Sequence, residues 1–124
     1  MVVQSVIGEF SNPMRVVFRV DASLEIGTGH VMRCLTLADR LRQSGSECIF
    51  ICRCHKGHLG ELILERGHRL SLLPMTQKYI GISNTVANKE HAKWLGVTWE
   101  WDAEQCAAIL SEELPDWLVV DHYA

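Results

Sequence analysis

The stretch Gly27-Thr28-Gly29-His30 combines residue types that suit anion binding and acid–base chemistry. Glycine reaches backbone conformations that other residues avoid, and it lets a ligand come close to the main chain. A helical pattern follows the stretch, and the N-terminus of a helix offers unpaired N–H groups and a partial positive charge. Histidine titrates near neutral pH and therefore suits a general base. The stretch predicts a phosphate-sized site that contains an imidazole.

A plainer interpretation of the same residues stays open at this point. His30 can cap the helix or pack against it without doing any chemistry, and the motif alone does not decide between the two roles. Gly27-x-Gly29 is also a short pattern, and Arg33 and Cys34 stand where the dinucleotide-binding fingerprint would place its third glycine. The sequence therefore predicts no dinucleotide cofactor.

Two aspartates each end a predicted strand. Asp21 ends the first strand and Asp121 ends the last one, where His122 and Tyr123 follow. Because the carboxyl ends of parallel strands share one rim, we expect both carboxylates at that rim. They could bind sugar hydroxyls or amides, or orient a histidine, and the Tyr123 phenol could donate to a substrate oxygen. For any single aspartate, however, a helix cap or a turn is the commoner role.

Two further groups of residues have weaker claims to function. Cys52, Cys54, His55 and His58 are close in sequence, but zinc sites usually separate paired cysteines by two or more residues, so we expect no metal centre. The tryptophans lack the basic patch of a base-stacking surface, and we expect them in core or domain-interface packing. They are Trp94, Trp99, Trp101 and Trp117.

Hydrophobic periodicity supplies the elements that position these residues. Near-continuous apolar strands alternate with amphipathic helices, which predicts a doubly wound, Rossmann-like α/β fold with a parallel sheet. We predict strands over 15–20, 47–53, 68–73 and 116–121, helices over 30–43, 58–66 and 102–113, and a loop or short irregular helix over 75–92. Asp102 is the expected cap of the last helix, whose buried face carries Cys106, Ile109 and Leu110.

Composition narrows the class of protein. The 124 residues, with 48% hydrophobic and 22% charged residues, fit one globular domain. A net charge of -3 argues against a protein that binds nucleic acid or an anionic membrane through positive charge. No apolar run is long enough to span a bilayer. Five cysteines without a secretory signal favour a reduced, cytoplasmic setting without a disulfide framework.

The ends of the chain suggest how it is organised. Residues 1–13 read as an extension outside the fold, and residues 14–124 read as one Rossmann-like domain. The chain stops directly after a predicted core strand, whereas domain ends normally lie in exposed segments. We therefore expect 14–124 to be an incomplete, truncated amino-terminal domain.

Segments 14–23, 26–38 and 116–124 closely resemble the amino-terminal half of a family of hydrolases. The family that these segments resemble is the UDP-2,4-diacetamido-2,4,6-trideoxy-β-L-altropyranose hydrolase (PseG) family of pseudaminic acid biosynthesis. The likeness also includes 50–53 and 57–59, and it is weakest over about 76–94. The family is similar to GT-B glycosyltransferases, most of all to the MurG enzymes of peptidoglycan synthesis.

The resemblance implies two Rossmann-like domains with the active site in the cleft between them. It implies hydrolysis without a metal or cofactor, in which water attacks the anomeric carbon of a UDP-sugar, inverts it and releases UDP. His30 would be the base, and Asp21 and Tyr123 would contact the sugar. Gly27, Thr28, Gly29 and Asp121 complete the substrate-binding residues that we expect.

In this family the second domain binds most of the nucleotide, and the chain ends before it. We therefore expect little or no turnover from these residues alone, because the diphosphate contacts and the closed cleft would be missing. Two alternatives remain: a MurG-like transferase that uses His30 as base on an acceptor hydroxyl, and a non-catalytic remnant or binding module.

Overall fold

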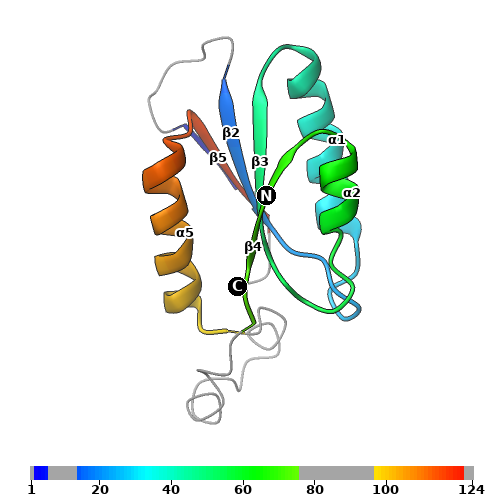
Figure 1. Cartoon of the computed structure of the whole chain (residues 1–124), viewed down its shortest axis with the longest axis vertical. Helices are drawn as coiled ribbons and strands as arrows, with labels where there is room; N and C mark the ends of the chain where they lie inside the picture. Colours follow the sequence, from blue (N-terminus) through cyan, green and yellow to red (C-terminus); the bar gives the residue numbers. More distant parts are fainter. Residues whose placement is uncertain (1, 6–13, 76–96, 122–124) are drawn as a thin grey trace.

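The computed structural model describes residues 2–5, 14–75 and 97–121, which form a central β-sheet with helices on both faces (Figure 1). The strands are β1 (Val2–Ser5), β2 (Arg15–Val20), β3 (Glu47–Arg53), β4 (Arg69–Leu73) and β5 (Trp117–Asp121). Their order across the sheet is β1-β5-β2-β3-β4. Strands β5, β2, β3 and β4 are parallel, and β1 pairs antiparallel with β5. The predicted α/β class with a parallel sheet is confirmed.

Helices α1 (Gly29–Gln43) and α2 (Gly60–Glu65) cover one face of the sheet, and α5 (Trp99–Glu113) covers the other (Figure 1). Apolar residues of α1 recur at helical spacing and are buried against the sheet. They are Val31, Cys34, Leu35 and Ala38. None of the helices in the described ranges has the length and apolar character that crossing a membrane would require.

Side chains along each strand alternate between the two faces of the sheet. The core beneath α1 and α2 contains Phe18 and Phe50, whose stacked rings have centroids 4.8 Å apart. Val20 belongs to this core and is the register partner of Asp121, so the Asp121 side chain lies on the α1 face. Arg19, the residue before Val20, lies on the α5 face.

The core beneath α5 is smaller among the described residues. It consists of Val17, Ile49, Ile51 and Leu73, with the partly buried Cys106, Ile109, Leu110 and Leu118 packed against it. The face of α5 that was predicted to be buried, with Cys106, Ile109 and Leu110, is therefore the face that contacts the sheet.

The boundaries of some elements differ from those expected. Helix α5 begins at Trp99, and its cap is Thr98, whose hydroxyl accepts the Trp101 N–H at 3.3 Å. Asp102, the expected cap, lies within the first turn and is buried. Helix α2 is shorter than 58–66, and most of the predicted loop 75–92 falls outside the described residues.

The amino-terminal segment also differs from the expectation that residues 1–13 lie outside the fold. Val2–Ser5 form β1 and pair with β5, with Val2 opposite Val120 and Ser5 opposite Trp117. Without this pairing the outer edge of β5 would present unpaired N–H and C=O groups, and a short extended segment satisfies them. Hydropathy alone gives little sign of such an edge strand.

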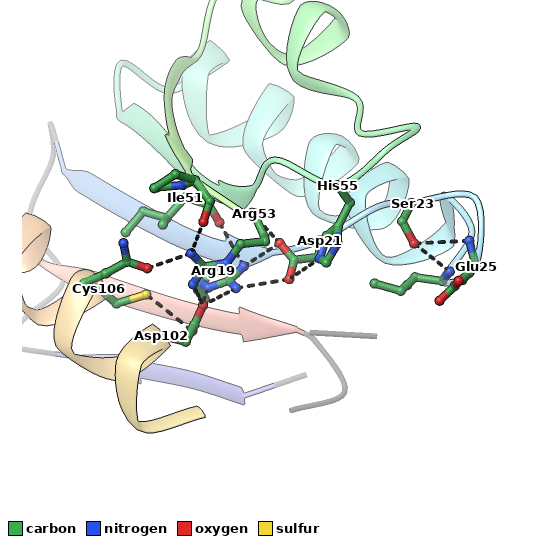
Figure 2. A network of polar contacts seen from close by, with 12 residues as sticks. Arg19, Asp21, Ser23, Glu25, Ile51, Arg53, His55, Asp102 and Cys106 are labelled. Carbon is green, nitrogen blue, oxygen red and sulfur yellow. Dashed lines mark hydrogen bonds and ion pairs between the residues drawn. The ribbon is translucent and has the colours of Figure 1, made fainter. Parts of the chain in front are cut away.

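A buried ion network joins α5 to the sheet (Figure 2). Arg19 donates from Nε and Nη2 to the two oxygens of Asp102, at 3.1 and 2.6 Å. Arg53 also pairs with Asp102, and its Nη1 donates to Gln105 at 2.6 Å. Burial opposes ionisation of Asp102, but hydrogen bonds from the two arginines outweigh it and hold the pKa of this carboxyl below its usual range.

Removing the charge of Asp102 should therefore be costly. In Asp102→Asn, the guanidinium groups of Arg19 and Arg53, 3% and 0% exposed, would lose their shared counter-charge. We expect the free energy of unfolding to fall by about 3–5 kcal/mol, as for other buried pairs broken on one side. Urea titration measures the loss, with Glu104→Gln on the exposed side of α5 as the matched control. A loss no larger than that of the control would contradict this role of Asp102.

Candidate active site

The loop between β2 and α1 is a tight turn organised by Ser23. Its hydroxyl accepts the N–H group of Glu25 at 3.2 Å (Figure 2) and that of Ile26 at 2.9 Å. Its carbonyl accepts the Gly27 N–H at 2.9 Å. Gly27 has a φ of 86°, in the left-handed region that other residues rarely adopt. This turn redirects the chain from the carboxyl end of β2 into the start of α1.

The N-terminus of α1 is open on the side of this turn. Thr28 precedes the helix without capping it through its side chain, and no acidic residue lies in the first turn. A Cβ built on Gly27 or Gly29 would meet no described atom within 4 Å. Packing in the described part of the chain therefore does not explain Gly29, and the arrangement has the features of the anion site that the sequence predicts.

His30 and Asp121, two residues selected from the sequence, meet at the carboxyl rim. His30 Nδ1 lies 2.9 Å from Asp121 Oδ1, and the Asp121 side chain is 3% exposed. Arg33, one turn further along α1, donates from Nε and Nη2 to both oxygens of the same carboxylate. The Cys34 thiol approaches Oδ2 at 3.7 Å. One carboxylate on β5 thus holds three side chains of α1.

The state of Asp121 decides which imidazole nitrogen is basic. Burial opposes its ionisation, but hydrogen bonds from Arg33 and His30 outweigh burial and lower the pKa of Asp121 to about 2. An ionised carboxylate only accepts, so His30 must donate from Nδ1 to form this bond. In the neutral imidazole, Nε2 then carries the lone pair that a general base requires. Since Nδ1 carries this proton, it cannot also accept from Arg33 Nη2, which lies 3.2 Å away.

The buried cysteines Cys34 and Cys52 do not suit a nucleophilic role. All five cysteines of the chain are unpaired. Burial raises the pKa of the Cys34 thiol to about 12, and burial has the same effect on Cys52 in β3. A nucleophilic cysteine needs a lowered pKa, so neither thiol suits that role at neutral pH.

Asp21 has a different set of partners. Arg19 donates to both of its oxygens, at 2.7 and 3.0 Å, and the N–H of Arg53 donates to Oδ1 at 2.7 Å. His55 Nε2 lies 3.6 Å from Oδ2. Burial disfavours the ionised form, but His55 and Arg19 outweigh it and hold the pKa of Asp21 well below its usual range. The contacts described for Asp21 do not include His30 or Asp121, and the idea that Asp21 binds sugar gains no support.

Asp21 instead helps to join two loops at the rim. Its bond to the Arg53 N–H ties the end of β2 to the end of β3. Beyond it, the N–H of Leu24 donates to the carbonyl of Lys56 at 3.0 Å. The loop that leads into α1 is therefore fixed to the loop that leads into α2.

The weaker sequence candidates do not come together. Among the described residues, no group of three or more histidine, cysteine or acidic side chains is placed to hold a metal ion. Cys52 is buried, Cys54 is exposed, His55 faces Asp21, and His58 Nδ1 accepts the N–H of Gly60.

The aromatic candidates have separate surroundings. Trp101 lies beneath the guanidinium of Arg53, 5.2 Å from the ring centroid, and Trp117 packs against the core beneath α1. Trp99 is 63% exposed. Trp94 and Tyr123 lie outside the described residues.

Sequence reasoning did not select Arg33, Arg19 or Asp102. Arg33 follows His30 by three residues, the spacing that brings helical side chains onto one face. Arg19 interrupts an apolar strand, and a charge in such a place needs a buried partner. These two signals were available, whereas Asp102, which binds Arg19, and Asp121, which binds Arg33, each lie more than 80 positions from their arginine.

In comparisons with known proteins, no family model matches this chain, and no curated protein or solved structure matches it. The family resemblance therefore rests on the sequence segments alone.

The acid limb of the stability curve should show the contribution of Asp121. Its pKa of about 2 lies below the ordinary aspartate value of about 3.9, so in this range the unfolded chain binds more protons than the folded one. The stability that this carboxylate contributes is complete above about pH 4 to 5 and is lost as the pH falls through about 2. Asp121→Asn should therefore flatten the decline of the unfolding free energy across this window.

Urea titrations at a series of pH values measure this slope. Glu104→Gln, on the exposed face of α5, is the control and should keep the slope of the parent chain. An Asp121→Asn protein whose stability falls as steeply as that of the parent would show that this carboxylate is not held ionised by its partners.

Proposed function

We propose that this chain is the catalytic, amino-terminal domain of a UDP-sugar hydrolase of GT-B architecture. Its substrate is a UDP-linked diacetamido-trideoxy sugar of the kind used in pseudaminic acid biosynthesis, and its products are UDP and the free sugar. The proposal includes a second Rossmann-like domain, which binds most of the nucleotide, and a cytoplasmic setting. The five unpaired cysteines are compatible with a reducing compartment.

The bond between His30 and Asp121 is the observation that carries this proposal. A buried, ionised carboxylate 2.9 Å from Nδ1 supports a base at Nε2. The pair lies where α/β proteins bind ligands, at the carboxyl rim of a parallel sheet. The open N-terminus of α1 beside it suits an anionic substrate. A histidine that only capped the helix would need no such partner.

In the proposed reaction, Nε2 of His30 accepts a proton from water as its oxygen attacks the anomeric carbon. The bond from this carbon to the diphosphate oxygen breaks, and its electron pair leaves with UDP. Because the water attacks opposite the leaving group, the anomeric configuration inverts. Asp121 stabilises the imidazolium that forms, as the carboxylate does in other aspartate–histidine pairs. Tyr123 is the proposed donor to a sugar oxygen.

Replacing the base should reduce turnover and leave binding nearly intact. We expect His30→Asn to lower kcat by about a hundredfold or more, with KM little changed, because a general base acts in the transition state. His58→Asn is the matched control, since Asn can also accept the Gly60 N–H that His58 binds. Equal kcat values for the two variants would return His30 to a structural role.

The assay follows UDP released from the UDP-sugar without any acceptor. It compares the chain alone with the chain joined to the nucleotide-binding domain of a family member, and the His30 variants are tested in the joined protein. We expect little or no turnover from the chain alone. UDP release by the joined protein only after an acceptor is added would instead indicate a transferase.

A further inference from the structure

Arg33 holds the Asp121 carboxylate at two points. Its Nε donates to Oδ2 and its Nη2 to Oδ1, and Oδ1 is also the oxygen that faces His30 Nδ1. A planar guanidinium with two parallel N–H groups matches a carboxylate in one orientation only. The carboxylate plane, and with it the position of Oδ1, is therefore set by Arg33.

The orientation of Asp121 matters because a second donor competes for it. The Cys34 thiol lies 3.7 Å from Oδ2, one residue beyond Arg33 on the same helix. A carboxylate that no longer binds Arg33 can rotate about its last side-chain bond, because that torsion is broad. Rotation would move Oδ1 away from Nδ1, and the imidazole would lose the bond that selects its tautomer.

Arg33 contributes to the ionisation of Asp121, but its exposed end lies where solvent screens charge. Its side chain is 51% exposed, and partly exposed ion pairs contribute little to the free energy of unfolding because solvent screens them. Its two-point contact nevertheless reaches a carboxylate that is 3% exposed and bonded to the proposed base. The same contact that holds the carboxylate ionised therefore also sets the oxygen that faces His30.

We propose that Arg33 is a positioning residue for His30, acting through Asp121. By fixing the carboxylate, Arg33 keeps the His30 proton on Nδ1 and leaves Nε2 as the basic nitrogen. This inference rests on the proposed function for its catalytic meaning, but the tautomer of His30 can be measured without turnover.

Nitrogen-15 NMR of the histidine-labelled chain tests the proposal at about pH 8.5, well above the ordinary histidine pKa of about 6.5. The parent chain should show His30 protonated on Nδ1, with the signal assigned by its absence in His30→Asn. In Arg33→Met, which keeps the apolar stem and removes every donor, this signature should give way to the Nε2–H form that free histidine prefers. Arg40→Met, at another exposed arginine of α1, is the control and should keep the parent signature.

Arg33→Lys provides the second variant, because it keeps the charge and loses the two-point contact. It should show a mixture of the two tautomers. The parent signature retained in full by either folded Arg33 variant would overturn the proposal. Failure of the proposed function would appear elsewhere, as UDP release that survives loss of His30, and would leave the tautomer result unchanged.

Discussion

The parallel pairing of β5 with β2 fixes which side chains can meet at the rim of the sheet. Val20 and Asp121 are register partners, so Asp121 shares the face on which Val20 packs beneath α1. A shift of this register by one residue would carry Asp121 to the other face, away from His30. The bond between His30 and Asp121, and with it the contact to Arg33, depends on that register.

The two faces of the sheet use their buried charges differently. Beneath α5, Arg19 and Arg53 share Asp102, and Arg19 also binds Asp21, so these four buried charges are paired with one another. On the α1 face, Asp121 is paired as well, but its partners include a titratable ring that is 17% exposed. A half-exposed arginine and a partly exposed histidine around one buried carboxylate can respond to a ligand, whereas the α5 network serves to place the helix and the loops.

The sequence was sufficient for much of this architecture because the relevant patterns are local. Apolar periodicity predicted β2, β3, β5 and most of α1, and the position of Gly27 predicted a turn that needs a left-handed residue. Local patterns were not enough to predict whether Thr98 or Asp102 caps α5. Both are capping residue types, and the pairing of Asp102 with Arg19 in β2 and Arg53 in β3 decided between them.

The roles of the site residues likewise depend on partners that are distant in the sequence. Asp21 and Asp121 occupy equivalent places at the ends of parallel strands, and both were predicted from the sequence to bind the ligand. Their roles differ because their partners differ. Asp21 binds Arg19, two residues before it, whereas Asp121 faces His30 of α1. Partners from distant segments decide the role of each carboxylate, and one sequence shows such partners only once the register is known.

Hydrolysis in oxygen-18 water by the chain joined to a nucleotide-binding domain tests the central claim most directly, since it reports which bond the water breaks. If His30 activates water toward the anomeric carbon, the label appears in the new hydroxyl of the sugar and UDP carries none. Label in UDP would show that water attacks phosphorus instead, and it would contradict the role proposed here for the base at the rim of the sheet.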